Sequence, residues 1–340
     1  MNDFCDGGFI AQRGDSMEQP YIALLRSFPG DAPAMLAAAG LTNVWENPEP
    51  SKLSADQIVE HAHGAAGVMI APGDGQFGSE FFDAVGDQLR VISCYSVGYD
   101  SVNVAEATAR GIAVGYTPGP TTEPTADITW LLLLGAARNA ASGERLVRSG
   151  TWQGISPSDR PGCRVVGKTL LIVGAGRIGR AVARRAIGWQ MKLLYNSRSA
   201  KPEMEAPPLS ARHVELDAGL AEADFVSIHT PLTEHTRYLF DAKRLAKIKR
   251  GAILINTARG AIIEEAALVD ALTSGHLAAA GLDVYEQEPL IHPGLMELDN
   301  TFLLPHVGSA TREDRIWMTE MAVANLAAGV RREALPHRAI

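Results

Sequence analysis

One short segment, Leu170 to Gly179, constrains the fold of this chain most. It reads as a buried strand followed by the turn Gly174-Ala-Gly176-Arg177-Ile178-Gly179, which has the spacing G-x-G-x-x-G, and then a helix. The first glycine makes a tight turn, the second lets the backbone approach a pyrophosphate, and the third lets helix and strand pack closely. The helix N-terminus then faces the anion. With 33 glycines in the chain the spacing alone is weak support. The strand and helix around it favour a dinucleotide site over a purely structural turn.

The end of the next predicted strand, Lys192–Tyr195, bears on which dinucleotide binds. Chains that bind NAD carry an acid about 20 residues after the first glycine, hydrogen-bonded to the ribose hydroxyls. Here that place holds Ser197, Arg198 and Ser199. An arginine and two hydroxyls suit the 2′-phosphate of NADPH. The alternative is that these residues form a solvated loop that discriminates poorly between NADPH and NADH. We expect NADPH as the cofactor, with NADH possible but weaker.

Strand-like and helix-like patterns alternate on both sides of this motif. Strands are expected at Tyr21–Leu25, Gly67–Ile70, Val91–Cys94, Ile112–Tyr116, Thr169–Val173, Lys192–Tyr195, Phe225–His229, Ala252–Asn256, Gly281–Val284 and Phe302–Leu304. Helices are expected at Ala32–Ala39, Ala55–His63, Ser79–Val85, Val104–Ala109, Ile178–Ile187, Ala242–Lys249 and Glu264–Thr273. Such alternation predicts parallel βαβ units. The expected fold class is α/β, with two Rossmann-like or flavodoxin-like domains.

A break at Thr117–Pro124, with three prolines and a glycine, separates the two series. One long helix, Thr125–Ser149, is expected after it, and its apolar part, Ile128–Leu134, indicates burial on more than one face. The last helix, Arg312–Arg331, follows the final strand and is expected to return to the first series. We predict a tail at 1–19, a substrate-binding domain at 20–118 and 312–340, and an NAD(P)-binding domain at 119–311 inserted within it and containing the long helix.

Composition restricts the partners. The 340 residues include 31 basic and 39 acidic side chains, a net charge of −8, which argues against nucleic acid or an anionic membrane as partner. The most apolar stretch, Ile128–Ala137, falls short of the roughly 18 residues needed to span a bilayer. The cysteines Cys5, Cys94 and Cys163 stand far apart, which fits a reducing cytoplasm. No metal-ligand spacing is evident, so no metal is expected.

Polar residues stand at the predicted carboxyl ends of the strands in the second series, where open parallel sheets bind ligands. Arg259 offers a guanidinium fork that matches a carboxylate. His306 can give a proton to a developing alkoxide. Glu288 can orient the imidazole and favour its protonated form. Taken alone, each of these three side chains could equally form a surface ion pair or cap a helix. Taken together, the three suit the reduction of a 2-oxo acid beside a nicotinamide.

These segments resemble the D-isomer-specific 2-hydroxyacid dehydrogenases, from about Tyr21 to Leu326. The matching signatures are the glycine turn, Asn256-Thr-Ala-Arg-Gly260, Gly281-Leu-Asp-Val-Tyr-Glu-Gln-Glu-Pro289 and Pro305-His-Val-Gly-Ser309. The resemblance implies that Arg259, Glu288 and His306 are catalytic. It places Asp283 at the nicotinamide carboxamide, and His229, Thr230, Pro231, Thr257, Ala258 and His306 along the cofactor. Substrate contacts would come from Arg259, His306, Val97 and Gly98, the last two in the loop Ser96–Asp100. It also implies a homodimer with the long helix in the interface.

Within the family, Ser197-Arg198-Ser199 in place of an acid is similar to the glyoxylate/hydroxypyruvate reductase branch. The expected activity is NADPH-dependent reduction of small 2-oxo acids, such as glyoxylate and hydroxypyruvate, to D-2-hydroxy acids with His306 as general acid. Phosphite dehydrogenase and a broad-specificity 2-oxoacid reductase are the alternatives among enzymes. A dinucleotide-sensing scaffold, similar to transcriptional corepressors that resemble this family, is the alternative from another class.

Overall fold

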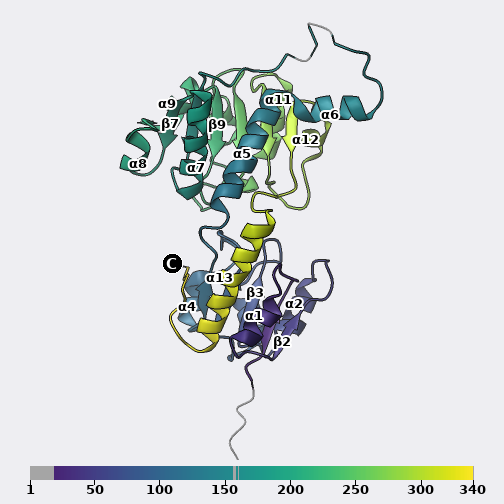
Figure 1. Ribbon diagram of the computed structural model, residues 1–340, viewed down its shortest axis with the longest axis vertical. Coiled ribbons are helices and arrows are strands. Elements are labelled where there is room, and N and C mark those ends of the chain that lie inside the picture. The colour runs from purple at the N-terminus through teal and green to yellow at the C-terminus, as the bar shows by residue number, and fades with distance from the viewer. Residues whose placement is uncertain (1–18, 156–157, 160, 340) are drawn as a thin grey trace, which may run out of the picture.

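The computed structural model describes residues 19–155, 158–159 and 161–339, which form two lobes (Figure 1). The smaller lobe is built on a five-stranded sheet with the order β2-β1-β3-β4-β5. Its strands are β1 (Ile22–Leu24), β2 (Val44–Glu46), β3 (Gly67–Ile70), β4 (Val91–Cys94) and β5 (Ala113–Gly115). All neighbours pair in parallel, in the order of a flavodoxin-like sheet.

The larger lobe is built on a seven-stranded parallel sheet with the order β12-β11-β10-β9-β6-β7-β8. Its strands are β6 (Thr169–Val173), β7 (Lys192–Asn196), β8 (Arg212–His213), β9 (Phe225–Ile228), β10 (Ile253–Asn256), β11 (Ala279–Leu282) and β12 (Thr301–Leu303). This is the Rossmann strand order with one additional edge strand. The strand order reverses between β6 and β9, and ligands bind at such a switch point. The predicted α/β class with two Rossmann-type sheets is confirmed.

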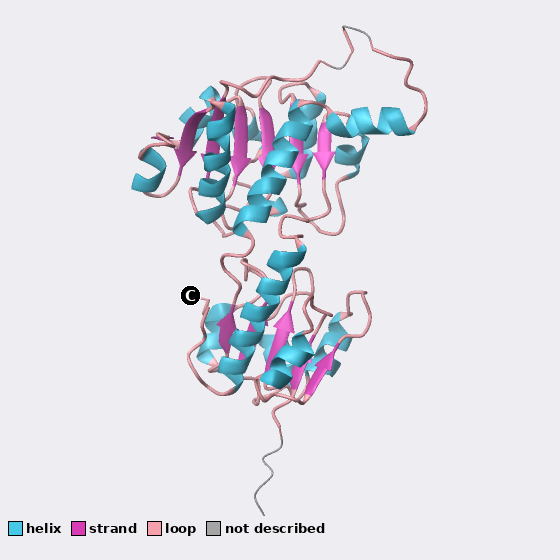
Figure 2. Ribbon diagram, viewed as in Figure 1, coloured by secondary structure: helices cyan, strands magenta, loops and turns pink. Residues whose placement is uncertain are grey.

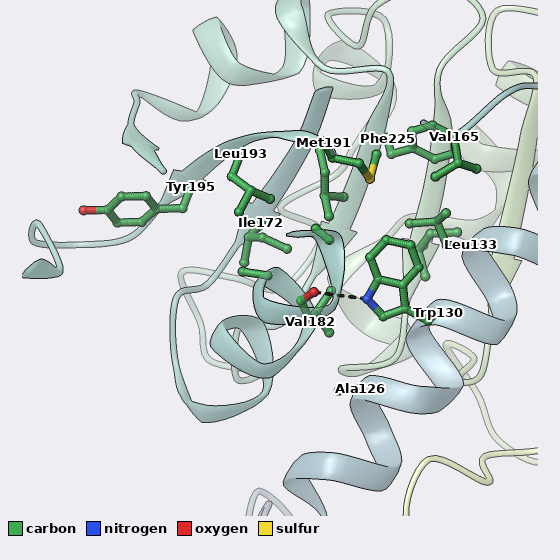
Figure 3. Packing of buried hydrophobic residues seen from close by; sticks show 14 of the residues in the cluster. Ala126, Trp130, Leu133, Val165, Ile172, Val182, Met191, Leu193, Tyr195 and Phe225 are labelled. Atoms are coloured by element: carbon green, nitrogen blue, oxygen red, sulfur yellow. Dashed lines mark hydrogen bonds between the residues drawn. The ribbon is translucent and has the colours of Figure 1, made fainter. Parts of the chain in front are cut away.

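Helices cover both faces of the sheets (Figure 2). The smaller lobe has α1 (Ala32–Ala38), α2 (Ala55–Ala62), α3 (Ser79–Val85) and α4 (Val104–Ala109). The larger lobe has α5 (Thr122–Ala137), α6 (Ala140–Arg148), α7 (Arg177–Ala186), α8 (Pro202–Glu205), α9 (Leu216–Glu222), α10 (Ala242–Leu245), α11 (Glu265–Thr273) and α12 (Pro293–Glu297). Figure 3 shows how α5 joins the larger core: Trp130 Nε1 donates a hydrogen bond to the carbonyl of Val182 on α7 at 3.1 Å.

The final helix, α13 (Arg312–Val330), packs against β3 and β4 of the smaller sheet, as the sequence predicts (Figure 1). Its apolar face, including Met318 and Leu326, is buried in the core that β1 also enters. Gly329 lies so close to Val91 that a Cβ atom there would fall 2.4 Å from the valine side chain. We propose on this basis that residues 20–118 and 312–340 form one domain and residues 119–311 the other.

The single long helix predicted at Thr125–Ser149 is wrong. The chain instead forms α5 and α6, which point in different directions (Figure 1). Asn139 lies between them with φ 54°, in the left-handed region that asparagine adopts more readily than most residues. The helix predicted at Ala242–Lys249 also ends earlier, at Leu245. The amides of Lys247 and Ile248 donate to carbonyls only three residues back, and the amide of Lys249 donates to the carbonyl of Leu220.

The short edge strands β2 and β8 were not predicted, and neither were α8, α9 and α12. Almost all of the predicted tail at 1–19 lies outside the described residues. In the part of the chain that the structure describes, no helix is both long and apolar enough to cross a membrane. The same part contains no cluster of three or more His, Cys, Asp or Glu side chains suited to a metal ion.

Candidate active site

A cleft of about 960 Å³ lies between the two lobes, and both contribute to its walls. The smaller lobe supplies Arg26, Tyr95, the loop from Val97 to Asp100, and Arg315 of α13. The larger lobe supplies the predicted residues Gly176, Arg177, Ile178, His229, Thr230, Pro231, Thr257, Ala258, Arg259, Asp283, Glu288 and His306. Most of the site residues predicted from the sequence therefore lie around one cleft. Gly174, Gly179, Ser197, Arg198 and Ser199 lie outside its lining.

The three glycines of the turn differ in the space around them. Gly174 has φ 102°, and a Cβ atom there would fall 2.7 Å from the backbone of His229 at the switch point. A Cβ atom at Gly179 would fall 2.2 Å from the carbonyl oxygen of Gly174. At Gly176 no atom lies within 4 Å, so this position opens into free space. The first and third glycines are thus required by packing, and the second leaves room for a ligand.

The loop Ser197–Ser199 follows β7, the strand that pairs with β6. Ser197 Oγ donates to the carbonyl of Ser199 at 2.6 Å, and His213 Nε2 lies 3.0 Å from the carbonyl of Ser197. The His213 ring stacks on Tyr195. Arg198 is exposed at the surface. The loop thus has an ordered backbone and an unburied guanidinium at the carboxyl end of the sheet, next to the glycine turn.

His306 and Glu288 form a close pair in the cleft. Nδ1 of His306 lies 2.7 Å from Oε2 of Glu288, and Oε1 of Glu288 accepts the amide of Tyr285 at 2.9 Å. Burial raises the pKa of the Glu288 carboxyl, but the hydrogen bond and charge of His306, the Tyr285 amide and the Arg259 guanidinium together bring it below its usual value. Glu288 is therefore a carboxylate at neutral pH.

Asp283 fixes the backbone that carries His306. Its two carboxylate oxygens accept the amides of Val307 and Gly308, each at 2.8 Å. His306 itself has φ 53°, a strained conformation for a residue other than glycine. Burial raises the pKa of the Asp283 carboxyl, and the two amides and His306 oppose that rise. This clamp was not predicted from the sequence, which gave no sign that Asp283 contacts the loop after His306.

A second histidine, His229, also lines the cleft, but its environment differs. Burial lowers the pKa of His229 to about 3. Its Nε2 atom lies 2.8 Å from Oγ of Ser227. The imidazole is therefore uncharged at neutral pH. Of the two histidines in the cleft, only His306 has a carboxylate, that of Glu288, within hydrogen-bond distance of its ring.

The turn after β10 positions Arg259. Asn256 is fully buried; its Nδ2 donates to the carbonyl of Arg259 at 2.9 Å, and its Oδ1 accepts the amide of Ala258 at 3.0 Å. A Cβ atom at Gly260 would fall 1.8 Å from the backbone of Tyr285, so this turn packs directly on the segment that leads to Glu288. Sequence reasoning missed the roles of Asn256 and Gly260, although both stand in the quoted motif.

Comparison with known proteins agrees with this geometry. Residues 130–308 match the family model described as D-isomer specific 2-hydroxyacid dehydrogenase, NAD binding domain. The chain is 40% identical over 314 residues to a glyoxylate reductase from Thermococcus onnurineus, covering 91% of this chain and 92% of that protein. It is 42% identical over 317 residues to glyoxylate/hydroxypyruvate reductase B from Erwinia tasmaniensis, covering 92% and 96%.

A solved structure shares the fold. The NADPH-dependent glyoxylate/hydroxypyruvate reductase from Sinorhizobium meliloti, in complex with NADP and malonate, matches with a TM-score of 0.80 and 29% identity, covering 95% of this chain and 97% of that one. The fold and the cleft thus define an oxidoreductase of the nicotinamide-dependent class. The chain belongs to the D-isomer-specific 2-hydroxyacid dehydrogenase family.

Proposed function

We propose that this protein reduces small 2-oxo acids, such as glyoxylate and hydroxypyruvate, to D-2-hydroxy acids with NADPH. The observation that carries the proposal is the meeting of Arg259 and the Glu288–His306 pair in one cleft, next to an open glycine turn. The names of the two reductases from Thermococcus onnurineus and Erwinia tasmaniensis support this substrate class.

The residues present fit a bound dinucleotide. The open position at Gly176 and the N-terminus of α7 would hold the pyrophosphate, and Arg198 with Ser197 and Ser199 would hold the 2′-phosphate of NADPH. His229, Thr230, Pro231, Thr257, Ala258 and Asp283 line the adjoining wall. When bound, the nicotinamide supplies the hydride. The cofactor of the reductase from Sinorhizobium meliloti supports the NADP preference.

The chain's own groups then handle the carboxylate and the proton. Arg259 binds the substrate carboxylate with charge-assisted hydrogen bonds, assisted by the backbone of Val97 and Gly98. Because Nδ1 of His306 faces Glu288, Nε2 is the atom that gives its proton to the carbonyl oxygen as that oxygen gains electrons. Glu288 stabilises the imidazolium before transfer, and in the reverse direction His306 takes the proton back.

A matrix of cofactors and substrates tests the proposal. NADPH and NADH are each assayed against glyoxylate, hydroxypyruvate, pyruvate and larger 2-oxo acids by the change in absorbance at the nicotinamide band. We expect the highest kcat/KM with NADPH and the smallest acids. Equal activity with larger acids would favour a broad-specificity reductase. Oxidation of phosphite with NAD, and no reduction of any 2-oxo acid, would overturn the proposal in favour of phosphite dehydrogenase.

We further propose that the protein is a cytoplasmic homodimer with α5 in the interface. Leu131 of α5 is 47% exposed although its neighbours Trp130, Leu132 and Leu133 are buried in the core. A second copy packed on α5 would cover this apolar side chain. The scattered cysteines favour a reducing compartment. Light scattering coupled to gel filtration tests the assembly, and a monomeric mass would overturn it.

A further inference from the structure

Arg259 is in contact with an acidic residue of the other lobe. Its Nε lies 3.2 Å and its Nη2 3.1 Å from Oδ1 of Asp100, with Oδ2 at 3.4 Å from Nε. Asp100 belongs to the loop after β4, whereas Arg259 follows β10, so the pair crosses the cleft. The sequence motifs do not predict this contact, because the two residues are 159 positions apart in the chain.

The hydrogen bonds that hold the Arg259 guanidinium leave two of its N–H donors available for a ligand. Nε and Nη2 donate to Asp100, and Nη1 donates to the carbonyl of Ala258 at 2.8 Å. A guanidinium has five N–H donors. Among the described residues no other hydrogen-bond acceptor contacts this group. One N–H on each Nη nitrogen therefore stays free, and two such donors suit a substrate carboxylate.

The loop of Asp100 is shaped around the same guanidinium. A Cβ atom at Gly98 would fall 1.6 Å from Nη2 of Arg259, so only glycine lets the arginine lie against this loop. Ser96 Oγ donates to the carbonyl of Gly98 at 2.5 Å, which fixes the loop locally. Asp100 thus ties Arg259 to the segment whose amides, at Val97 and Gly98, serve the same carboxylate in the proposed function.

We propose that Asp100 is a positioning residue: it holds Arg259 against the smaller lobe with two donors left for the substrate. This inference rests on the proposed function. It does not make the pair a source of stability, because the Arg259 and Asp100 side chains are 30% and 39% exposed, and exposed ion pairs contribute little to unfolding free energy. The effect of Asp100 is instead on where the guanidinium lies when the substrate arrives.

The opposite interpretation is that Asp100 stands in for the substrate carboxylate and competes with it. The two interpretations predict opposite signs for Asp100→Ala. A competitor, once removed, gives a lower KM for glyoxylate. A positioning residue, once removed, lets Arg259 move, and a misplacement of about 1 Å at an active site can cost about 100-fold. Asp100→Asn keeps an oxygen acceptor for Nε and Nη2, so it restores part of the positioning without the charge.

The test compares Asp100→Ala, Asp100→Asn and a matched control, Asp83→Ala. Asp83 pairs with Arg110 on the smaller lobe, away from the cleft. For Asp100→Ala we expect kcat/KM for glyoxylate to fall by about 10- to 100-fold, mostly through KM, with an unchanged KM for NADPH and an unchanged Tm. Asp100→Asn should lie between Asp100→Ala and the wild type, and Asp83→Ala should match the wild type.

Oxalate binding to the protein with NADPH, measured by calorimetry, separates failure of this inference from failure of the proposed function, because it needs Arg259 but no turnover. We expect Asp100→Ala to bind oxalate more weakly than the wild type. Equal or tighter binding, or a lower KM for glyoxylate, would overturn the positioning role. A loss accompanied by a lower Tm and weaker NADPH binding would also overturn it, in favour of a structural role. A wild-type protein that reduces no 2-oxo acid would overturn the proposed function itself.

Discussion

The carboxylate of Glu288 lies 2.7 Å from Nδ1 of His306, although the two residues belong to different loops at the edge of the larger sheet. Glu288 is itself held by the amide of Tyr285, and His306 by the clamp of Asp283 on the two residues that follow it. Both partners are thus fixed through backbone hydrogen bonds. Since Nδ1 is engaged, the proton that leaves or enters the ring in the proposed reaction must do so at Nε2.

Under the proposed function, replacing His306 should remove the proton donor and leave cofactor binding intact. An alkoxide beside a nicotinamide is too basic to persist unprotonated, and a positioned acid contributes about 10²- to 10⁴-fold to such steps. We expect His306→Ala to lower kcat for glyoxylate reduction within that range while the Kd for NADPH, measured by fluorescence, is unchanged. The exposed His235 supplies a matched control: His235→Ala should keep the wild-type kcat. A His306→Ala enzyme with normal kcat would exclude the residue as general acid.

Replacing Glu288 by glutamine should shift the pH dependence in a defined direction. The pKa of Glu288 is lowered, against the effect of burial, by His306 and the Tyr285 amide, so the side chain is negative throughout the neutral range. That charge favours the protonated imidazole. In the proposed reaction, reduction needs His306 protonated and fades as pH rises, whereas oxidation of the hydroxy acid needs it neutral and fades as pH falls. Without the charge, both limits should move to lower pH.

The measurement is kcat/KM for glyoxylate against pH in the wild type and Glu288→Gln. Glu286 provides the control, because its carboxylate binds the hydroxyl of Tyr238 and the amide of Glu265 rather than His306. Glu286→Gln should therefore keep the wild-type profile. If Glu288→Gln kept it too, the 2.7 Å contact would not tune the acid.

The sequence predicted those parts of the fold and site that depend on local pattern. Buried parallel strands appear in the sequence as short apolar runs. The glycine turn and the polar residues at the strand ends are also visible in the sequence, and the parallel sheet brings them together at one edge. Sequence reasoning missed the edge strands β2 and β8, because neither contains a fully buried residue and their sequences, Val-Trp-Glu and Arg-His, form no apolar run. The sequence analysis merged α5 and α6 into one helix, because the break between them depends on the left-handed backbone conformation of Asn139, which composition does not predict.

Contacts between the lobes were beyond sequence reasoning for a different reason. The loop Ser96–Asp100 was recognised by resemblance, but its contact with Arg259 depends on how two separately folded sheets face each other. The clamp of Asp283 on the His306 loop is similar: it spans 24 and 25 residues and leaves no periodicity. Side chains that position other side chains are therefore the part of the site for which the structure was needed.

Asn325 should be important for stability rather than activity. It is fully buried on α13, where its Nδ2 donates to the carbonyl of Tyr116 and its Oδ1 accepts the amide of His337, each at 3.0 Å. These two hydrogen bonds hold the segment around His337 next to the end of β5. Asn325→Ala leaves both partners unsatisfied, which costs about 1–3 kcal/mol of unfolding free energy. Urea unfolding followed by circular dichroism measures this loss of stability. We expect the variant to keep the wild-type KM values for glyoxylate and NADPH. An unchanged unfolding midpoint would contradict the stabilising role of Asn325.

Arg198 should decide the preference for NADPH. NADPH and NADH differ only in the 2′-phosphate, and Arg198 is exposed at the loop where an acid would repel that phosphate. A charge-assisted hydrogen bond contributes about 1.5–3 kcal/mol, or roughly 10- to 150-fold. We expect Arg198→Ala to raise KM for NADPH by an amount in that range and to leave KM for NADH as it is. Arg184→Ala, which removes an exposed arginine at the far end of α7, is the matched control and should change neither constant. If Arg198→Ala raised KM equally for both cofactors, the arginine would support the loop and not bind the 2′-phosphate. A wild-type protein that prefers NADH would refute the role of Arg198 altogether.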